Sequence, residues 1–370
     1  MCSCVPLLRS RYGAHLSKEQ VAELVAPHSD TLKLVHSWLE YHGIPSSSIS
    51  VTHGGSSLKL TGVSVSRAND LLGASYQLYR HVKTNETMVR TVGYALPAAL
   101  HAHVQTVEPT SSFDSPHPQW QTPRKRLGGV AVELAEAASG EPVTVPSRRD
   151  DKNHDGTTPS FLSSLYSTSA YSPAATDKNM IGIVGFLGQY PSPTDLTLFM
   201  NKYRSNGADA TFTALQANGG GYDPGNPHAE PNLDIQYSQG MTYPTRQLFY
   251  STGRGPTGTK DEYLSWLEYI INQPSIPQTI SIAYGHDEKI YPRLRARFVC
   301  SLFAQLGARG VSVLFSSGDD GVGEGDCKDG SGNVRFIPIF PATCTCGLFS
   351  WLASSTQARV RVTHHTAALP

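Results

Sequence analysis

The sequence has little charge and no surplus of either sign. Its 370 residues include 30 Lys and Arg and 30 Asp and Glu, so the formal net charge is zero, and charged residues make up 16% of the chain. Because binding to a phosphate backbone requires a basic surface, we expect no nucleic-acid partner. Hydrophobic residues account for 39%, which is enough to bury a core and excludes a wholly disordered chain.

Long apolar runs are also missing. No run reaches the 18 or so residues of a membrane-spanning helix, so we expect no membrane partner. The first residues, Met-Cys-Ser-Cys-Val-Pro-Leu-Leu-Arg, hold too short an apolar stretch for a secretory signal peptide.

Cysteines are few and are placed near the two ends of the chain: Cys2, Cys4, Cys300, Cys327, Cys344 and Cys346. Cys344 and Cys346 have the wrong spacing for a zinc knuckle, so we assign no metal ligands. A disulfide between Cys327 and Cys344 would close a short loop, and free thiols are an equally open reading. Asn85-Glu86-Thr87 is the only glycosylation sequon.

Residues 1–108 have the pattern of a small α+β unit. Ser17-Lys18-Glu19-Gln20 has the form of a capping box that opens a helix. A second and a third helix and four strands are predicted after it, the strands near 49–51, 58–60, 77–83 and 88–94.

Residues 109–158 differ in composition from the chain on either side. They are rich in Pro, Ser and Gly and carry short charge runs at 124–126 and 148–151. Such a segment is typical of an exposed, cleavable linker. A long surface loop of one domain is the alternative, but loops of this length are uncommon inside compact domains.

From residue 159 onward, strand and helix patterns alternate. Strands are predicted near 180–187, 210–215, 246–250, 278–284 and 311–316, with helices near 192–205, 262–272 and 291–306. This alternation predicts an α/β fold, a parallel sheet covered by helices on both faces. In such sheets, active sites lie at the carboxyl ends of the strands.

A pair of acids is the first candidate for chemistry. In Glu230-Pro-Asn-Leu-Asp234, Pro231 suits the first turn of a helix, and the four-residue spacing places both carboxylates on one face. A solvated acidic face at a helix start is the alternative. The glycine-rich segment 218–225 just before the pair favours a functional reading.

A third acid follows the last apolar strand. Asp319 lies in Ser317-Gly-Asp-Asp-Gly321, directly after the strand near 311–316. The carboxyl end of a buried strand between glycines is a favoured catalytic position. A turn in which the aspartate bonds its own backbone is the alternative.

Together these residues resemble the sedolisins, the serine-carboxyl peptidases that include fungal and lysosomal tripeptidyl-peptidases. The resemblance extends over about 7–107 and 157–344 and is carried by several separated segments in the same order: Ser10-Arg-Tyr-Gly-Ala-His-Leu-Ser17, Glu230-Pro-Asn-Leu-Asp-Ile-Gln-Tyr237, Ser281-Ile-Ala-Tyr-Gly285 and Gly307–Gly321. It is strongest to secreted fungal tripeptidyl-peptidases.

The resemblance implies a fold and an activity. The fold would be a subtilisin-like sheet preceded by a ferredoxin-like activation prodomain. Glu230 would be the general base, Asp234 its partner and Asp319 the donor to the oxyanion, in a secreted zymogen that releases tripeptides at acidic pH. The substrates would be proteins and peptides, and the prodomain would act as an intramolecular inhibitor.

The sequence departs from the family in its last part. The G-T-S-x-S segment that carries the nucleophilic serine is absent, and so are the ligands of the calcium ion expected from the family. Residues 159–344 therefore represent a partial peptidase domain, and 345–370 a divergent tail that we expect not to continue the sheet. We expect a chain truncated at both ends and inactive as it stands.

Three functions remain open from the sequence. The first is a tripeptidyl-peptidase zymogen, and the second is a non-catalytic product of prodomain and partial peptidase domain that only binds. The third is an unrelated hydrolase that uses a Glu/Asp pair as glycosidases do, which the ordered motifs disfavour.

Overall fold

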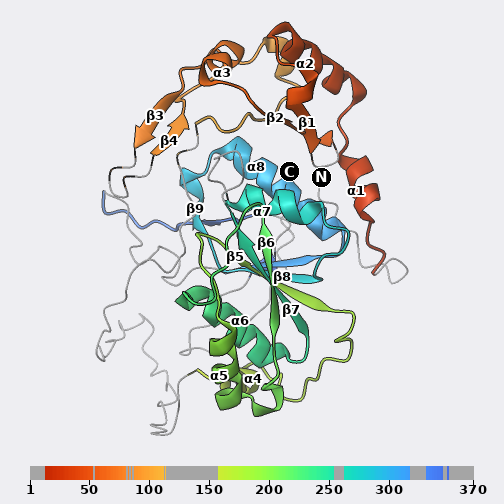
Figure 1. Cartoon of the computed structure of the whole chain (residues 1–370), viewed down its shortest axis with the longest axis vertical. Helices are drawn as coiled ribbons and strands as arrows, with labels where there is room; N and C mark the ends of the chain where they lie inside the picture. Colours follow the sequence, from red (N-terminus) through yellow and green to blue (C-terminus); the bar gives the residue numbers. More distant parts are fainter. Residues whose placement is uncertain are drawn as a thin grey trace, which may run out of the picture.

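A computed structural model of the chain shows a small N-terminal unit and a larger sheet domain (Figure 1). The small unit ends at residue 113 and the sheet domain begins at residue 157. The structure describes residues 13–52, 55–80, 82, 85, 87–111, 113, 157–253, 262–316, 331–344 and 348–349.

The larger unit is built on one parallel sheet of six strands. In the order in which they lie across the sheet, they are β12 (Leu348–Phe349), β10 (Ser312–Phe315), β8 (Thr279–Ile282), β5 (Met180–Gly185), β7 (Arg246–Thr252) and β6 (Phe212–Ala217). Every neighbouring pair in this sheet is parallel. The predicted parallel α/β architecture is confirmed.

Helices cover both faces of the sheet (Figure 1). One layer holds α7 (Glu262–Ile271) and α8 (Arg293–Ala308), and the other holds α4 (Pro159–Leu165), α5 (Pro193–Tyr203) and α6 (Ala229–Thr242). The inward residues of α7 include Tyr263, Trp266 and Leu267, each 0% exposed. They pack with Val184 and Ile280 of the sheet in the main core, as apolar residues at helical spacing do.

The divergent tail contributes a strand that the sequence does not predict. Leu348 and Phe349 pair in parallel with Leu314 and Phe315 of β10. The expectation that the tail does not continue the sheet is therefore wrong at these two residues. The edge of β10 offers unpaired backbone groups, and any short extended segment that reaches it can bond to them.

The small unit contains three helices and two hairpins. Its elements are α1 (Lys18–Val25), α2 (Ser29–Tyr41), β1 (Ile49–Thr52), β2 (Ser57–Leu60), α3 (Val65–Leu72), β3 (Gln77–Arg80) and β4 (Thr87–Arg90). The capping box predicted at Ser17 and Gln20 is confirmed, with both of its hydrogen bonds present.

The strands of the small unit differ from the ferredoxin-like sheet expected from the resemblance. In the described residues β1 pairs only with β2, and β3 only with β4. Each strand is four residues long and bonds its neighbour in sequence, the pairing that costs the least loop-closure entropy. The α+β character is as predicted, but a single four-stranded sheet is not formed there.

Short elements complete the described chain. A two-residue strand pair joins β9 (His286–Asp287) to β11 (Ile339–Phe340) in antiparallel fashion. Single 3₁₀ turns lie at Ser46–Ser48, Ala98–Leu100, Ser205–Gly207 and Glu288–Ile290. Among the helices that the structure describes, none is long and apolar enough to cross a membrane.

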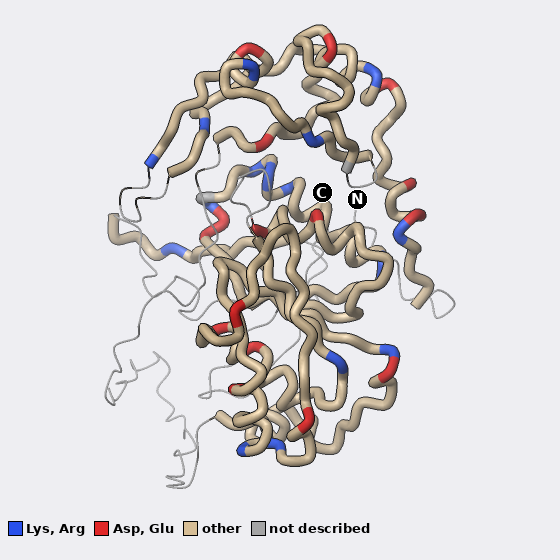
Figure 2. Tube along the Cα trace, in the orientation of Figure 1, with Lys and Arg blue, Asp and Glu red and all other residues tan. Residues whose placement is uncertain are grey.

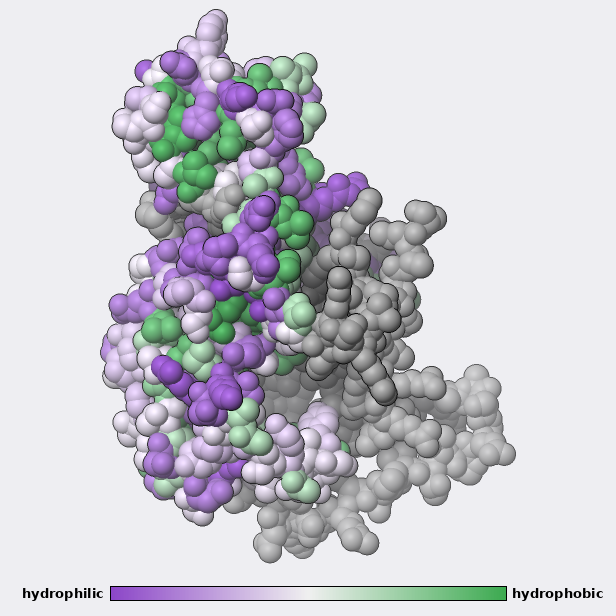
Figure 3. Space-filling model, turned by 90° about the vertical axis from the view of Figure 1, so that its right-hand side faces the viewer, coloured by the Kyte–Doolittle hydropathy of each residue, from purple (hydrophilic) through white to green (hydrophobic). Residues whose placement is uncertain are grey.

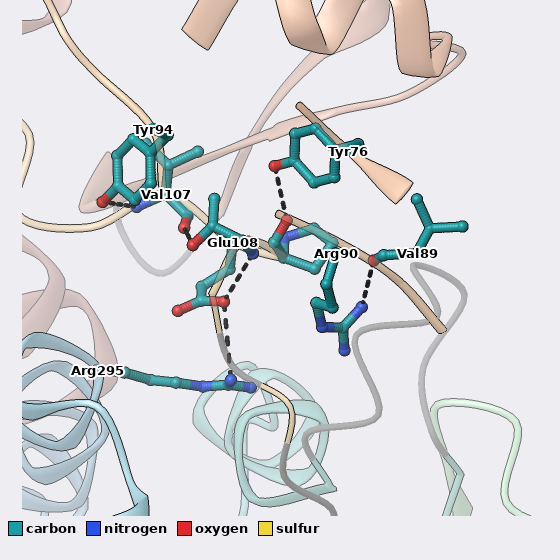
Figure 4. A network of polar contacts seen from close by, with 9 residues as sticks. Tyr76, Val89, Arg90, Tyr94, Val107, Glu108 and Arg295 are labelled. Atoms are coloured by element: carbon teal, nitrogen blue, oxygen red, sulfur yellow. Dashed lines mark hydrogen bonds and ion pairs between the residues drawn. The ribbon is translucent and has the colours of Figure 1, made fainter. Parts of the chain in front are cut away.

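The small unit contacts the layer of α7 and α8 at two places. At one end, the Leu16 amide donates to the Ala308 carbonyl at 2.9 Å, and Lys18 Nζ donates to the Asn272 carbonyl at 2.6 Å. At the other end, Glu108 pairs with Arg295 at 3.6 Å (Figure 4). The small unit thus holds α8 near both of its ends.

The second contact is a compact polar cluster (Figure 4). Arg295 is 3% exposed and Glu108 13%. Arg90 is 1% exposed and donates to the Val89 carbonyl at 2.8 Å. Tyr76 donates its hydroxyl to the Pro109 carbonyl at 2.7 Å. Burial, followed by the charge of Glu108, raises the pKa of Tyr76 to about 12.

Basic residues lie on α8, the helix that faces the small unit (Figure 2). Arg293, Arg295 and Arg297 all belong to this helix, but only Arg295 is buried. The nearby Arg295 charge contributes, after burial, to the lowered pKa of Arg90. Glu108 therefore lies where two guanidinium groups approach each other, and its negative charge offsets their repulsion.

The small unit keeps many apolar side chains on its surface. Figure 3 shows apolar residues gathered among polar ones on the part of the small unit that faces the viewer. Tyr41, Leu78 and Val92 are 87%, 70% and 78% exposed. The core of this unit is small, with Leu39 and Leu100 among its few fully buried residues. A small core is typical of a unit that depends on its partner for stability.

A disulfide joins Cys300 of α8 to Cys344, with their Cα atoms 5.2 Å apart. The Cys327–Cys344 pairing considered from the sequence is therefore wrong, because Cys344 is already bonded. Cys300 lies far away in sequence, and only the packing of α8 against the segment that follows β11 brings the two sulfurs together. Cys327 lies outside the described residues.

Candidate active site

The predicted acid pair lies in the first turns of α6. This helix begins at Ala229, with His228 as its N-cap residue and Pro231 in its first turn. It ends at Thr242, and the C-cap residue Tyr243 is followed directly by Pro244, which cannot donate a helical hydrogen bond. The segment thus forms a helix with both acids near its N-terminus, as the spacing predicts.

The two acids interact with each other in a buried setting. Burial is the main cause, and the neighbouring Glu230 the second cause, of a pKa of Asp234 well above its ordinary value. A carboxyl group that loses hydration and faces a second carboxyl keeps its proton more tightly. The pair therefore favours a state in which one proton is shared between the two acids. Both residues are half-buried, so the pair is not the fully solvated acidic face of the alternative.

Tyr284 completes the cluster from the sheet. It follows β8 by two residues and is 1% exposed. Its hydroxyl donates to Gln189 Oε1 at 3.2 Å. Burial raises the pKa of Tyr284 well above its ordinary value, and the charges of Asp234 and Glu230 raise it further. The tyrosine thus lies close enough to both acids to feel their charge, and it stays protonated.

The cluster lies at the carboxyl edge of the sheet. The loop after β6 leads into α6, and Tyr284 follows β8, so both come from the ends where parallel strands finish. The end of β10 is beside that of β8, with Phe315 opposite Ile282. Asp319, the third predicted acid, lies outside the described residues, so the arrangement of all three acids remains a prediction.

A further buried acid supports the loop between β5 and α5. Glu262, at the start of α7, is 1% exposed, and its Oε2 accepts the Leu187 amide at 2.7 Å. Leu187 has a φ of 62°, a left-handed conformation that a branched side chain adopts only where the surroundings hold it. The bond from Glu262 fixes this turn just before Gln189.

The glycine-rich segment before α6 has a packing role. A Cβ on Gly220 would lie 1.9 Å from the Ser251 carbonyl oxygen at the end of β7. Only glycine allows the two backbones to approach so closely. Ser251 in turn donates its hydroxyl to the Gly221 carbonyl. The segment therefore anchors the loop that delivers α6 to the sheet edge.

Comparison with known proteins finds relatives over most of the chain. Residues 8–113 match the family model "Pro-kumamolisin, activation domain". Tripeptidyl-peptidase SED2 of Arthroderma otae is 32% identical over 91% of this chain and 57% of its own length. Probable tripeptidyl-peptidase SED3 of Trichophyton verrucosum is 32% identical over 90% of this chain and 56% of its own.

These relatives confirm the resemblance inferred from the sequence motifs. The chain spans a little over half the length of the curated relatives it matches. Among solved structures, Pseudomonas sedolisin, a serine-carboxyl proteinase complexed with two molecules of pseudo-iodotyrostatin, aligns with a TM-score of 0.38 and 18% identity over 52% of each chain.

The family resemblance implies a calcium ion, but the part of the chain that the structure describes contains no cluster of ligands for it. No three His, Cys, Asp or Glu side chains come together there in a group that could hold a metal ion. The residues that the structure describes therefore do not fit the ion, and no chemical step is assigned to it.

Two other predicted features are only partly visible. Asn85 of the sequon is exposed and lies in the turn between β3 and β4, with a φ of 56°. This position is accessible, and its glycosylation stays a prediction. The linker at 109–158 is described only at its two ends, so its role stays a prediction as well.

Sequence reasoning missed the residues that surround the acid pair. Tyr284 lies inside the Ser281–Gly285 segment that carries the family resemblance, but a tyrosine near a strand end has no local signature of function. Glu262 at a helix start is expected for electrostatic reasons alone. Gln189 lies in a loop. The signal for all three is their proximity in space, which a single sequence does not reveal.

Proposed function

We propose that this chain is the zymogen form of a serine-carboxyl peptidase that releases tripeptides from the free N-termini of proteins and peptides at acidic pH. One observation carries the proposal. Two acids one helical turn apart lie at the carboxyl edge of the sheet, and the pKa of Asp234 is raised there by burial and by Glu230. The names of the relatives, tripeptidyl-peptidases, support the substrate class.

The pair performs the work that histidine performs in other serine peptidases. Glu230 accepts the proton of a nucleophilic hydroxyl while that oxygen attacks the peptide carbonyl. Asp234, which holds its proton, donates a hydrogen bond to Glu230, so the base keeps a negative charge and a fixed orientation. Glu230 then returns the proton to the leaving amine. This division of protons exists only where Asp234 is protonated and Glu230 ionised.

Asp319 is proposed as the donor to the oxyanion of the tetrahedral intermediate. A protonated carboxyl can act as such a donor, and one donor contributes roughly 10²–10³ in rate. The nucleophile is not assigned, because the 370 residues contain no G-T-S-x-S segment.

We further propose that residues 1–108 are the activation prodomain and intramolecular inhibitor, and that 109–158 form the segment cleaved on activation. Residues 159–344 then form the peptidase part. The match of 8–113 to an activation domain supports this division. The Cys300–Cys344 disulfide and the exposed Asn85 support a secreted location, since disulfides persist in oxidising compartments.

An assay on the purified chain tests this function. A tripeptide with a free N-terminus and a chromogenic amide at its carboxyl end is incubated between pH 3 and 7. We expect no release from the 370 residues alone, because they contain no G-T-S-x-S segment. From a chain extended by a segment that supplies the nucleophilic serine, we expect release that rises toward acidic pH and that disappears when the N-terminus of the substrate is acetylated. Equal cleavage of the acetylated substrate contradicts the tripeptidyl-peptidase assignment.

The missing G-T-S-x-S segment favours a second candidate, a non-catalytic protein that binds peptides. In that case the same peptide binds at acidic pH, as detected by calorimetry, and no amide is released. Binding without turnover, in the extended chain as well, supports this second function, and turnover by the extended chain rejects it.

A further inference from the structure

The residue midway between the two acids bonds to a different part of the molecule. Asn232 lies two positions from Glu230 and two from Asp234, about 200° around the helix from Glu230. Its Oδ1 accepts the Ser192 amide at 2.8 Å, and its Nδ2 donates to Asp195 Oδ2 at 2.7 Å. One face of α6 therefore carries the acids, and the opposite face is bonded to the start of α5.

These bonds replace a conventional cap at the beginning of α6. The His228 side chain makes no capping hydrogen bond to the helix. Instead, the His228 amide donates to the Tyr190 carbonyl at 2.9 Å, and the Tyr190 amide donates to His228 Nδ1 at 3.4 Å. The first turn of α6 is thus attached along the loop that runs from Tyr190 to Ser192.

The other end of the same loop is attached to the rest of the site. Glu262 accepts the Leu187 amide, and Gln189 accepts the hydroxyl of Tyr284. The loop from Leu187 to Ser192 therefore connects Tyr284 at one end with Asn232 at the other. The position of this loop sets how the acids lie relative to the tyrosine.

We propose that Asn232 is a positioning residue that fixes the rotation of α6, so that Glu230 and Asp234 keep their half-buried positions near Tyr284. Its planar amide is hydrogen-bonded to Ser192, the N-cap residue of α5, and to Asp195 in the first turn of α5. Two such bonds resist rotation more strongly than one, because they fix both a distance and a direction. The inference rests on the proposed role of the acids, but its test does not require catalysis.

The groups that face Asp234 determine how a rotation of α6 would alter its pKa. They are Glu230 on its own helix and Tyr284 after β8, and Glu262 lies near that tyrosine. Rotation of α6 admits water to Asp234, and restored hydration lowers the pKa of a buried carboxyl. A more open site is therefore detectable as a lower pKa of Asp234.

The experiment measures the protonation of Asp234 in the full chain by infrared titration. Its carboxyl band is assigned by its loss in Asp234→Asn. We expect Asn232→Ala to lower the pKa of Asp234 by about one unit. Asn232→Asp keeps an acceptor for the Ser192 amide but replaces the donor to Asp195 with a carboxylate, so we expect the pKa of Asp234 to fall in this variant as well.

Ser192→Ala is the matched control. It removes the hydroxyl that accepts the Asp195 amide at 3.2 Å, but it keeps the backbone amide bonded to Asn232. We expect it to lower Tm without moving the pKa of Asp234. If both Asn232 variants titrate like the wild type, or if Ser192→Ala shifts the pKa as much as they do, the positioning role is rejected.

The peptidase proposal fails separately from this one. A shifted Asp234 titration in a chain without peptidase activity supports the positioning role and leaves only the reaction in error. Peptidase activity together with an unchanged titration of Asp234 in Asn232→Ala supports the proposed peptidase function and rejects the positioning role of Asn232.

Discussion

Two acid sites in this molecule show how the partner of a buried carboxyl group decides its use. Glu108, at the junction of the two units, is paired with Arg295 and lies near Arg90. Asp234, at the sheet edge, has Glu230 and Tyr284 for neighbours. The first site is balanced in charge and joins two parts of the chain. The second holds like charges together, which costs stability and keeps a proton available for transfer.

The two acid sites also lie in different helix layers. The junction lies on α8, and the acid pair lies on α6 across the sheet (Figure 1). The contacts at Ala308 and Arg295 belong to the layer that faces the small unit. A change at one site should therefore leave the other nearly unaffected, since distant sites without shared partners act independently.

The largest expected effect is on catalysis. In a chain extended by a segment that supplies the nucleophilic serine, Glu230→Gln removes the proton acceptor and should lower kcat/KM for tripeptide release by about 10²–10⁴-fold, with little change in Tm. Asp223→Asn, an exposed acid in the loop before α6, is the control and should retain full activity. Activity that survives in Glu230→Gln would remove the pair from the mechanism.

The next effect is on the junction. Glu108→Gln leaves Arg295 buried without its charged partner and should lower the free energy of unfolding by about 3 kcal/mol, measured by urea denaturation. Arg297→Ala changes an exposed arginine of the same helix and should stay within about 0.5 kcal/mol. Equal losses in the two variants would show that the ion pair contributes no more than a surface charge.

The raised pKa of Asp234 also predicts how the free energy of unfolding depends on pH. Because the pKa of Asp234 is raised in the folded state, the folded chain binds this proton more tightly than the unfolded chain does. The free energy of unfolding therefore falls as the pH rises from the ordinary pKa of an aspartic acid, about 3.9, through the raised value. Asp234→Asn should remove this decline and increase stability at neutral pH.

Thermal unfolding of the two proteins between pH 3 and 8 checks this prediction. The control is Asp223→Asn, which should keep the pH dependence of the wild type. A wild-type stability that increases with pH where Asp234→Asn does not would mean that Asp234 is stabilised as a charge.

The smallest effect distinguishes two buried tyrosines. Tyr76→Phe removes the hydrogen bond to the Pro109 carbonyl and should cost about 0.5–1 kcal/mol in urea denaturation, with no change in the titration of Asp234. Tyr284→Phe loses a comparable bond to Gln189 and should also alter that titration, because the hydroxyl it removes is close enough to interact electrostatically with both acids. Identical behaviour of the two variants would contradict the distinction between the sites.

Much of the fold could be predicted from local pattern. The capping box at Ser17, the apolar face of α7 and the buried strand β5 all follow from the spacing of a few neighbouring residues. The pairing of the tail strand with β10 could not be predicted, because two residues have no periodicity to detect. The partner of Cys344 was missed for the same kind of reason, since a cysteine carries no mark of which distant cysteine it will meet.

What the sequence alone determined is the relation between near neighbours. With 3.6 residues in each turn, Glu230 and Asp234 must share a face once that segment is a helix, and Asn232 must face away from them. Only the tertiary structure decided that Tyr284 and Asn232's partners on α5 would surround the pair, and that Arg295 would meet Glu108. These contacts depend on the order of strands in the sheet and on which helix packs on which face, and both are set by the burial of the whole core.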